Sequence, residues 1–127
     1  MKSLAPNFFV RDMDKTIDFY KSLGFEVTMS VPAPDNKEIQ WAMMKAGEVI
    51  VMFQTFVNLA DQLPEISREK GGSLLLYIQV DQIRKFFEKV KSKVTVLHGL
   101  EKAFYGATEF SILDNNGYVL TFAEDEK

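Results

Sequence analysis

Residues 7–13 read NFFVRDM and residues 77–83 read YIQVDQI, and these two stretches decide the fold of the chain. Each is an apolar run that leads through an acidic residue into a helical pattern, and they lie 70 residues apart. Residues 50–53 (IVMF) and 119–122 (VLTF) repeat in the same way at a spacing of 69. A repeat of this length is typical of one supersecondary unit that the chain uses twice.

The first half begins with a short strand and a helix. Asp12 is a good N-cap residue for that helix. Met13, Ile17 and Tyr20 recur at spacings of four and three, which predicts an amphipathic helix of about ten residues. Gly24 is expected to end it, because glycine tolerates the left-handed conformation at a helix C-terminus. The expected strands are residues 4–10, 25–29, 39–44 and 49–53.

The second half repeats this order. Asp81 is expected to cap a second helix. Four apolar residues share one face of that helix: Ile83, Phe86, Phe87 and Val90. The pair Asn116 and Gly117 is the strongest hairpin signal in the chain. The expected strands are residues 73–80, 94–97, 108–113 and 118–122, and residues 99–106 are expected to form a loop.

The chain is predicted to be a single domain of residues 1–127. It comprises a first module of residues 1–55, a linker of residues 56–72 and a second module of residues 73–127. The linker is polar and is expected to hold a short helix near residues 59–62. With 46 % hydrophobic residues and eleven phenylalanines, a chain of this length can bury a core of its own.

Composition narrows the classes of function. The net charge of −3 argues against nucleic acid as a partner, because phosphate binding needs a concentrated positive field. No stretch approaches the roughly 20 apolar residues of a membrane span, and residues 1–6 do not resemble a signal peptide. The chain has no cysteine, so disulfide and thiolate chemistry are not expected, and a cytoplasmic location is predicted.

Residues 10–25, VRDMDKTIDFYKSLGF, resemble the opening of the vicinal oxygen chelate superfamily, in which V-R-D and an apolar residue precede F-Y and L-G-F. This superfamily includes glyoxalase I, extradiol dioxygenases and bleomycin-resistance proteins. Residues 105–122, YGATEFSILDNNGYVLTF, resemble its closing strands, with Asn115 where proline is usual. The two motifs stand near the two ends of the sequence, so the resemblance covers nearly the whole chain.

The resemblance implies an α+β fold of two β-α-β-β-β modules, whose sheets curl into an open barrel with the site on its concave side. If Phe8 and Val10 pack under the first helix, strand alternation assigns the inward positions. On the opening strands these are Ala5, Asn7, Phe9, Leu75, Tyr77 and Gln79. On the closing strands they are Met52 and Thr121.

Metal-dependent members of the superfamily carry a His or Glu at one inward position on each of four strands, since a divalent ion needs converging nitrogen or oxygen ligands. Here the four positions hold Ala5, Met52, Leu75 and Thr121, none of which is a usual ligand. The single histidine, His98, is expected at the end of a strand near a loop. The sequence therefore predicts neither a metal nor another cofactor.

No catalytic residue is predicted either. The sequence has no phosphate-binding glycine loop followed by lysine, and no nucleophile elbow. The carboxylates of Asp12 and Asp14 are explained by a helix N-terminus, and those of residues 124–126 by a solvated tail. The alternative is a glyoxalase-like or dioxygenase-like enzyme whose metal ligands are His98, Glu48 or Glu109, some of them from a second subunit. A further alternative is a domain whose own side chains fill the cleft.

The predicted function is metal-independent binding of an aromatic or cationic organic ligand, in an apolar cleft like that of bleomycin-resistance proteins. Aromatic and methionine side chains stack on flat or cationic groups and adapt to their shape. The residues predicted to bind the ligand are Asn7, Phe9, Trp41, Met52, Tyr77, Gln79, Phe104, Tyr105 and Thr121. Phe53 and Phe110 are expected in the core instead. The resemblance also implies a homodimer.

Overall fold

The computed structural model describes residues 1–126. They form two compact units, of which the first spans Met1–Arg68 and the second begins at Glu69. The first unit comprises β1 (Asn7–Val10), α1 (Met13–Ser22), β2 (Glu26–Pro32), β3 (Ile39–Ala46), β4 (Val49–Thr55) and α2 (Phe56–Leu59). The second comprises β5 (Leu75–Gln79), α3 (Ile83–Val90), β6 (Thr95–Lys102), β7 (Ala107–Leu113) and β8 (Val119–Asp125).

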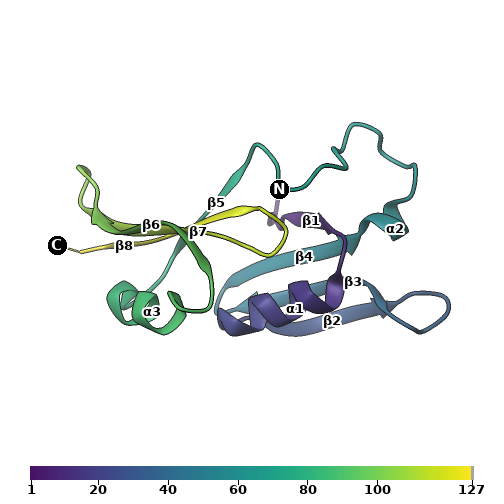
Figure 1. The fold of residues 1–127 in the computed structure, drawn as a ribbon, viewed down its shortest axis with the longest axis horizontal. Coiled ribbons are helices and arrows are strands. Elements are labelled where there is room, and N and C mark those ends of the chain that lie inside the picture. The colour runs from purple at the N-terminus through teal and green to yellow at the C-terminus, as the bar shows by residue number, and fades with distance from the viewer. Residues whose placement is uncertain (127) are drawn as a thin grey trace. The chain divides into compact units, whose positions relative to one another are not determined.

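Each unit folds into one four-stranded sheet, and the two sheets have the same topology (Figure 1). The strand order is β1-β4-β3-β2 in the first and β5-β8-β7-β6 in the second. The opening strand pairs in parallel with the closing strand in both units, and the other pairs are antiparallel. The predicted α+β fold of two β-α-β-β-β modules is confirmed, because the 70-residue repeat corresponds to two copies of one topology.

The long helix of each unit, α1 or α3, packs on one face of its sheet through aromatic rings. In the first unit, the Tyr20 ring of α1 lies 4.7 Å from the Phe53 ring of β4. In the second, the Phe86 ring of α3 lies 4.9 Å from the Phe122 ring of β8. Phe53 and Phe110 are both fully buried, so their predicted place in the core is confirmed. The face of each sheet that points away from its long helix is called its distal face below.

The two helices begin in different ways. Asp12 caps α1 as predicted, since its Oδ1 accepts the backbone N–H of Lys15 at 3.0 Å. Asp81 was predicted to cap α3, and this prediction is wrong. The N-cap of α3 is Gln82, which has a left-handed φ of 55° and makes no side-chain capping bond. A carboxylate from the end of the chain, that of Glu124, binds the free N–H groups there instead.

Two predicted boundaries of secondary-structure elements differ from those in the structure. The helix of the linker is α2, which begins at Phe56 and ends at Leu59. It therefore overlaps the expected residues 59–62 only at Leu59. The predicted loop at residues 99–106 is shorter than expected, because β6 continues to Lys102. His98 therefore lies inside a strand, not at its end. Irregularities in the β6–β7 pairing on both sides of His98 allow Gly99 to lie within the strand.

Candidate functional site

The distal face of the first sheet carries a row of methionines. Across the four strands, Asn7 pairs with Met52, Met52 with Met43, and Met43 with Met29. The next row runs Phe9, Gln54, Trp41 and Val31. The α1 side of the same strands holds buried residues such as Val51 and Phe53, so alternation directs these two rows away from α1. The four predicted site residues of this unit, Asn7, Phe9, Trp41 and Met52, thus share one face.

A chain of side-chain amides crosses this unit. Asn7 Nδ2 donates to Gln54 Oε1 at 3.0 Å, and Gln54 Nε2 donates to Asn58 Oδ1 at 2.7 Å. Asn58 Nδ2 then donates to Gln40 Oε1 at 3.0 Å. At the first amide of this series, Asn7 Oδ1 is buried and has no hydrogen-bond partner among residues 1–126, so one acceptor on this face is unused there. Sequence reasoning missed three of the four amides, although the alternation that assigns Met52 also assigns Gln54.

The distal face of the second sheet is more polar. One row runs Tyr77, Thr121, Ser111 and His98, and the next runs Gln79, Ala123, Glu109 and Glu101. Tyr77, Gln79 and Thr121 had been predicted to bind the ligand, and they lie in these two rows. Thr121 is buried, and its hydroxyl shares a hydrogen bond of 2.8 Å with that of Ser111.

Glu109 joins two of the predicted aromatic residues. Its Oε2 accepts a hydrogen bond from the Tyr77 hydroxyl at 2.5 Å and another from the Tyr105 hydroxyl. The Tyr105 ring in turn contacts the Phe104 ring edge to face, with 5.0 Å between their centroids. Tyr77 comes from β5 and Tyr105 from the turn between β6 and β7, so Glu109 holds together side chains from separate elements. Three aromatic rings are thereby linked to one carboxylate.

The hydrogen bonds to Glu109 change the acidity of both phenols. The pKa of Tyr77 is raised above its ordinary value, first by its hydrogen bond to Glu109 and then by burial. The pKa of Tyr105 is raised as well, and its hydrogen bond to Glu109 is again the largest cause. Both phenols therefore remain protonated, and remain donors to Glu109, at pH values where an ordinary tyrosine begins to ionise.

A cavity of about 360 Å³ opens beside this cluster. Its lining includes His98, Glu101, Phe104, Glu109 and Ser111. Phe104 is completely exposed, and Tyr77 and Tyr105 are exposed over about half of their surfaces (49 % and 57 %). Exposed apolar side chains that lie together are typical of a ligand-binding or interaction surface. We call Tyr77, Phe104, Tyr105 and Glu109 the tyrosine cluster.

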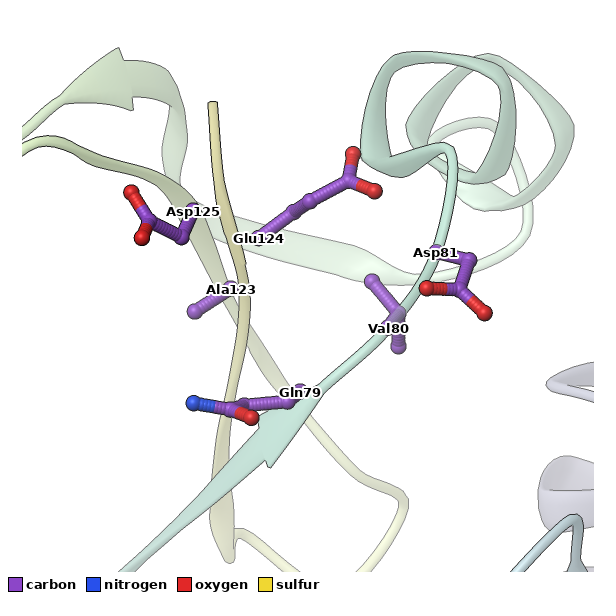
Figure 2. A pocket seen from close by; sticks show the side chains of 6 residues that line it. All are labelled: Gln79, Val80, Asp81, Ala123, Glu124 and Asp125. Atoms are coloured by element: carbon purple, nitrogen blue, oxygen red, sulfur yellow. The ribbon is translucent and has the colours of Figure 1, made fainter. Parts of the chain in front are cut away.

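A second cavity in the same unit has a structural explanation (Figure 2). It is lined by Gln79, Val80, Asp81, Ala123, Glu124 and Asp125. Figure 2 shows the Glu124 side chain extending toward the first turn of α3, whereas Asp125 points to the other side. The Glu124 carboxylate accepts the N–H groups of Gln82 and Ile83 at 2.9 and 3.0 Å. The prediction of a solvated tail is wrong here, since Glu126 also pairs with Arg84 at 2.9 Å.

A comparison of the sequence with models of protein families identifies the family of the chain. The sequence model described as Glyoxalase/Bleomycin resistance protein/Dioxygenase superfamily matches residues 4–122. The chain belongs to this superfamily. A comparison with curated proteins gives no match to the sequence.

Several solved structures have the same fold as this chain. A bleomycin-binding protein complexed with bleomycin has a TM-score of 0.68 and 21 % identity, covering 99 % of this chain and 100 % of its own. TioX from Micromonospora sp. ML1 has a TM-score of 0.76 at 18 % identity, with 99 % and 100 % covered. A protein of unknown function from Agrobacterium tumefaciens str. C58 has a TM-score of 0.78 at 22 % identity, with 99 % and 95 % covered.

Some members of the superfamily depend on a metal ion, so it matters which side chains of this chain could bind a metal. Within residues 1–126, no three His, Cys, Asp or Glu side chains lie together as a metal would require. His98 and Glu109 do line the same cavity, whereas Glu48 lies in the turn between β3 and β4 of the first unit.

No helix in the described part of the chain is both long and apolar enough to span a membrane.

We expect the phenols of Tyr77 and Tyr105 to ionise at a higher pH than an ordinary tyrosine does. At the pH where an ordinary tyrosine is half ionised, both phenols should be ionised to a smaller extent, because ionisation would place a phenolate against the Glu109 carboxylate. The measurement is an NMR titration of protein labelled at tyrosine Cζ. Glu109→Gln should lower both pKa values, and Glu48→Gln should leave them unchanged. Ordinary titration of both residues in the unchanged protein would contradict the hydrogen bonds to Glu109.

Proposed function

We propose that this protein binds a small organic ligand, aromatic or cationic, and that binding requires no metal ion. The observation that carries the proposal is the tyrosine cluster, in which three exposed aromatic rings are linked to Glu109 beside a cavity. Flat and cationic groups stack on such rings. The bleomycin-binding relative, solved with bleomycin, supports the same class of function.

The methionine row of the first unit offers a second apolar surface for a ligand. Met29 and Val31 are exposed by 57 % and 41 %, and Met43 and Met52 lie beside them in the sheet. Methionine side chains are flexible and polarizable, so they adapt to ligands of different shape. The unused acceptor of Asn7 borders this row and would orient a ligand that carries an N–H or O–H group.

The absence of a metal requirement rests on the donors. The four positions that we assign to the superfamily's metal ligands from the sequence hold Ala5, Met52, Leu75 and Thr121, whose side chains are poor ligands for a divalent ion. Thr121 already shares its hydroxyl with Ser111. The homodimer implied by the resemblance and the cytoplasmic location predicted from the lack of cysteine stay predictions, and sedimentation velocity tests the first of them.

Ligand binding is testable by NMR of protein labelled at the methionine methyl groups and at tyrosine Cζ. The protein is treated with EDTA, dialysed and titrated with bleomycin and with 2-naphthylmethylammonium. We expect the signals of Tyr77 and Tyr105 to shift in a saturable way, and those of Met29, Met43 and Met52 to shift for ligands that reach the methionine row. Met13 and Met44 are buried on the α1 side and serve as internal controls.

Two results would overturn the proposal. One is the lack of a saturable shift at any distal-face signal with either compound. The other is binding that appears only after Zn²⁺, Ni²⁺, Mn²⁺ or Fe²⁺ is added back, which would favour the metal-dependent enzyme.

A further inference from the structure

We propose that the tyrosine cluster is a subsite for an organic cation that carries N–H donors, such as a primary ammonium or a guanidinium group. This inference rests on the proposed binding function and names the chemical class of group that the second unit would select. It depends on which atoms of the cluster are already used and on which remain available.

The two oxygens of Glu109 differ in their partners. Both phenols donate to Oε2, so this oxygen has its hydrogen bonds supplied by Tyr77 and Tyr105. Oε1 has no hydrogen-bond partner among the described residues. The phenols therefore fix the orientation of the carboxylate and leave one charged acceptor free. A charged acceptor held in place forms strong bonds to N–H donors of a cation.

Among residues 1–126, no ion pair includes this carboxylate. The ion pairs of the described residues join Arg84 with Glu126 and Lys91 with Glu88. The nearest strand neighbour of Glu109 on β6 is another acid, Glu101, and like charges directly opposite one another are unfavourable. Lys102 also lines the cavity, but it pairs in the sheet with Thr108 and thus alternates to the other face from Glu101. A bound cation would remove the repulsion between the two acids.

The rings around Glu109 favour an organic cation over a bare ion. Tyr77, Tyr105 and Phe104 offer exposed π-faces, which attract a cation through the ring quadrupole and its alkyl substituents through apolar contact. A metal ion would need further oxygen or nitrogen ligands, and no group of three such side chains lies together among residues 1–126. Besides Glu109, the lining includes Glu101, His98 and Lys102 from β6, so two carboxylates and one lysine border the cavity.

The test compares three probes that share one ring system. They are 2-naphthylmethylammonium, the neutral 2-naphthylmethanol and the quaternary N,N,N-trimethyl-2-naphthylmethylammonium ion. With the unchanged protein, we expect the primary ammonium to bind roughly ten times more tightly than the neutral alcohol. The quaternary ion should fall between them, because it keeps the cation–π attraction and lacks N–H donors. Affinities are measured by NMR titration at about 50 mM salt, where screening is weak.

Glu109→Gln should remove the roughly tenfold preference for the ammonium ion over the alcohol, because the charged acceptor is lost. Glu48→Gln is the matched control, since it removes the same charge from an exposed turn in the first unit and should keep the tenfold preference. Tyr105→Phe keeps the ring but removes one hydrogen bond to Oε2, and it should lower the preference by about threefold. This variant keeps the test informative if the change at Glu109 perturbs folding.

The outcomes separate this inference from the function on which it rests. Equal binding of ammonium and alcohol to the unchanged protein would overturn the cation subsite and leave ligand binding intact. A preference that survives in Glu109→Gln would overturn it as well. If none of the three probes and no bleomycin binds, the proposed function itself fails.

Discussion

Replacing Phe53 by alanine is expected to lower the free energy of unfolding by about 3–5 kcal/mol, the largest change among the substitutions considered. Phe53 is completely buried at the centre of the first unit. Its ring lies 4.7 Å from that of Tyr20 and 5.8 Å from that of Phe8, so truncation leaves a cavity between α1 and the sheet. Because the ring lies under α1, neighbouring side chains can fill that cavity only in part.

Urea unfolding followed by far-UV circular dichroism measures this loss. Phe104→Ala is the matched control, because it removes the same side chain from a completely exposed position. The control should change the free energy of unfolding by less than about 0.5 kcal/mol. A loss below about 1 kcal/mol for Phe53→Ala would contradict the packing of α1 on the sheet.

The same variant tests whether the chain is one cooperative domain, as we propose. Trp41, the single tryptophan, lies in the first unit and reports on it by fluorescence, whereas helices and strands of both units contribute to circular dichroism. A single domain should show coincident transitions by both probes, shifted together by Phe53→Ala. Two steps in the circular dichroism curve, of which Phe53→Ala shifts only the step that coincides with the fluorescence change, would show that the two units unfold independently.

The architecture could be predicted from the sequence because its signals are local or periodic. The 70-residue repeat fixed the topology, since two similar patterns fold into two similar units. Strand alternation assigned the distal positions, and the register confirms that Asn7 lies beside Met52 and Tyr77 beside Thr121. The cap of α1 was also readable, because Asp12 and Lys15 are three residues apart.

The contacts of the candidate site could not be predicted in the same way. Tyr77 and Glu109 are 32 residues apart, and no periodicity links a phenol on β5 to a carboxylate on β7. The position of Glu109 depends on the register of β7 with β6 and β8, which pairing irregularities in β6 alter locally. Gly99 was interpreted as a loop residue, since a single glycine indicates a loop and a bulged strand equally well.

The start of α3 shows how a distant residue can replace a local signal, and it leads to the second large effect. Glu124→Ala is expected to lower the free energy of unfolding by about 2 kcal/mol. Its two carboxylate oxygens accept the N–H groups of Gln82 and Ile83, which the helix itself leaves without acceptors. The negative charge also interacts favourably with the positive end of the helix dipole. Glu124→Gln should cost about half as much, because one neutral oxygen remains as an acceptor.

Asp125→Ala is the control for this change, since it removes an equal charge from the adjacent, exposed residue, which has no side-chain hydrogen bond in the described structure. It should change the free energy of unfolding by less than about 0.5 kcal/mol. Hydrogen exchange gives a local readout, because the amides of Gln82 and Ile83 should exchange faster in Glu124→Ala and at the normal rate in Asp125→Ala. Equal free energies of unfolding and equal exchange rates in the two variants would contradict this role of Glu124. They would mean that water accepts the N–H groups at the start of α3 as well as Glu124 does, and that β8 is not needed to hold the helix in place.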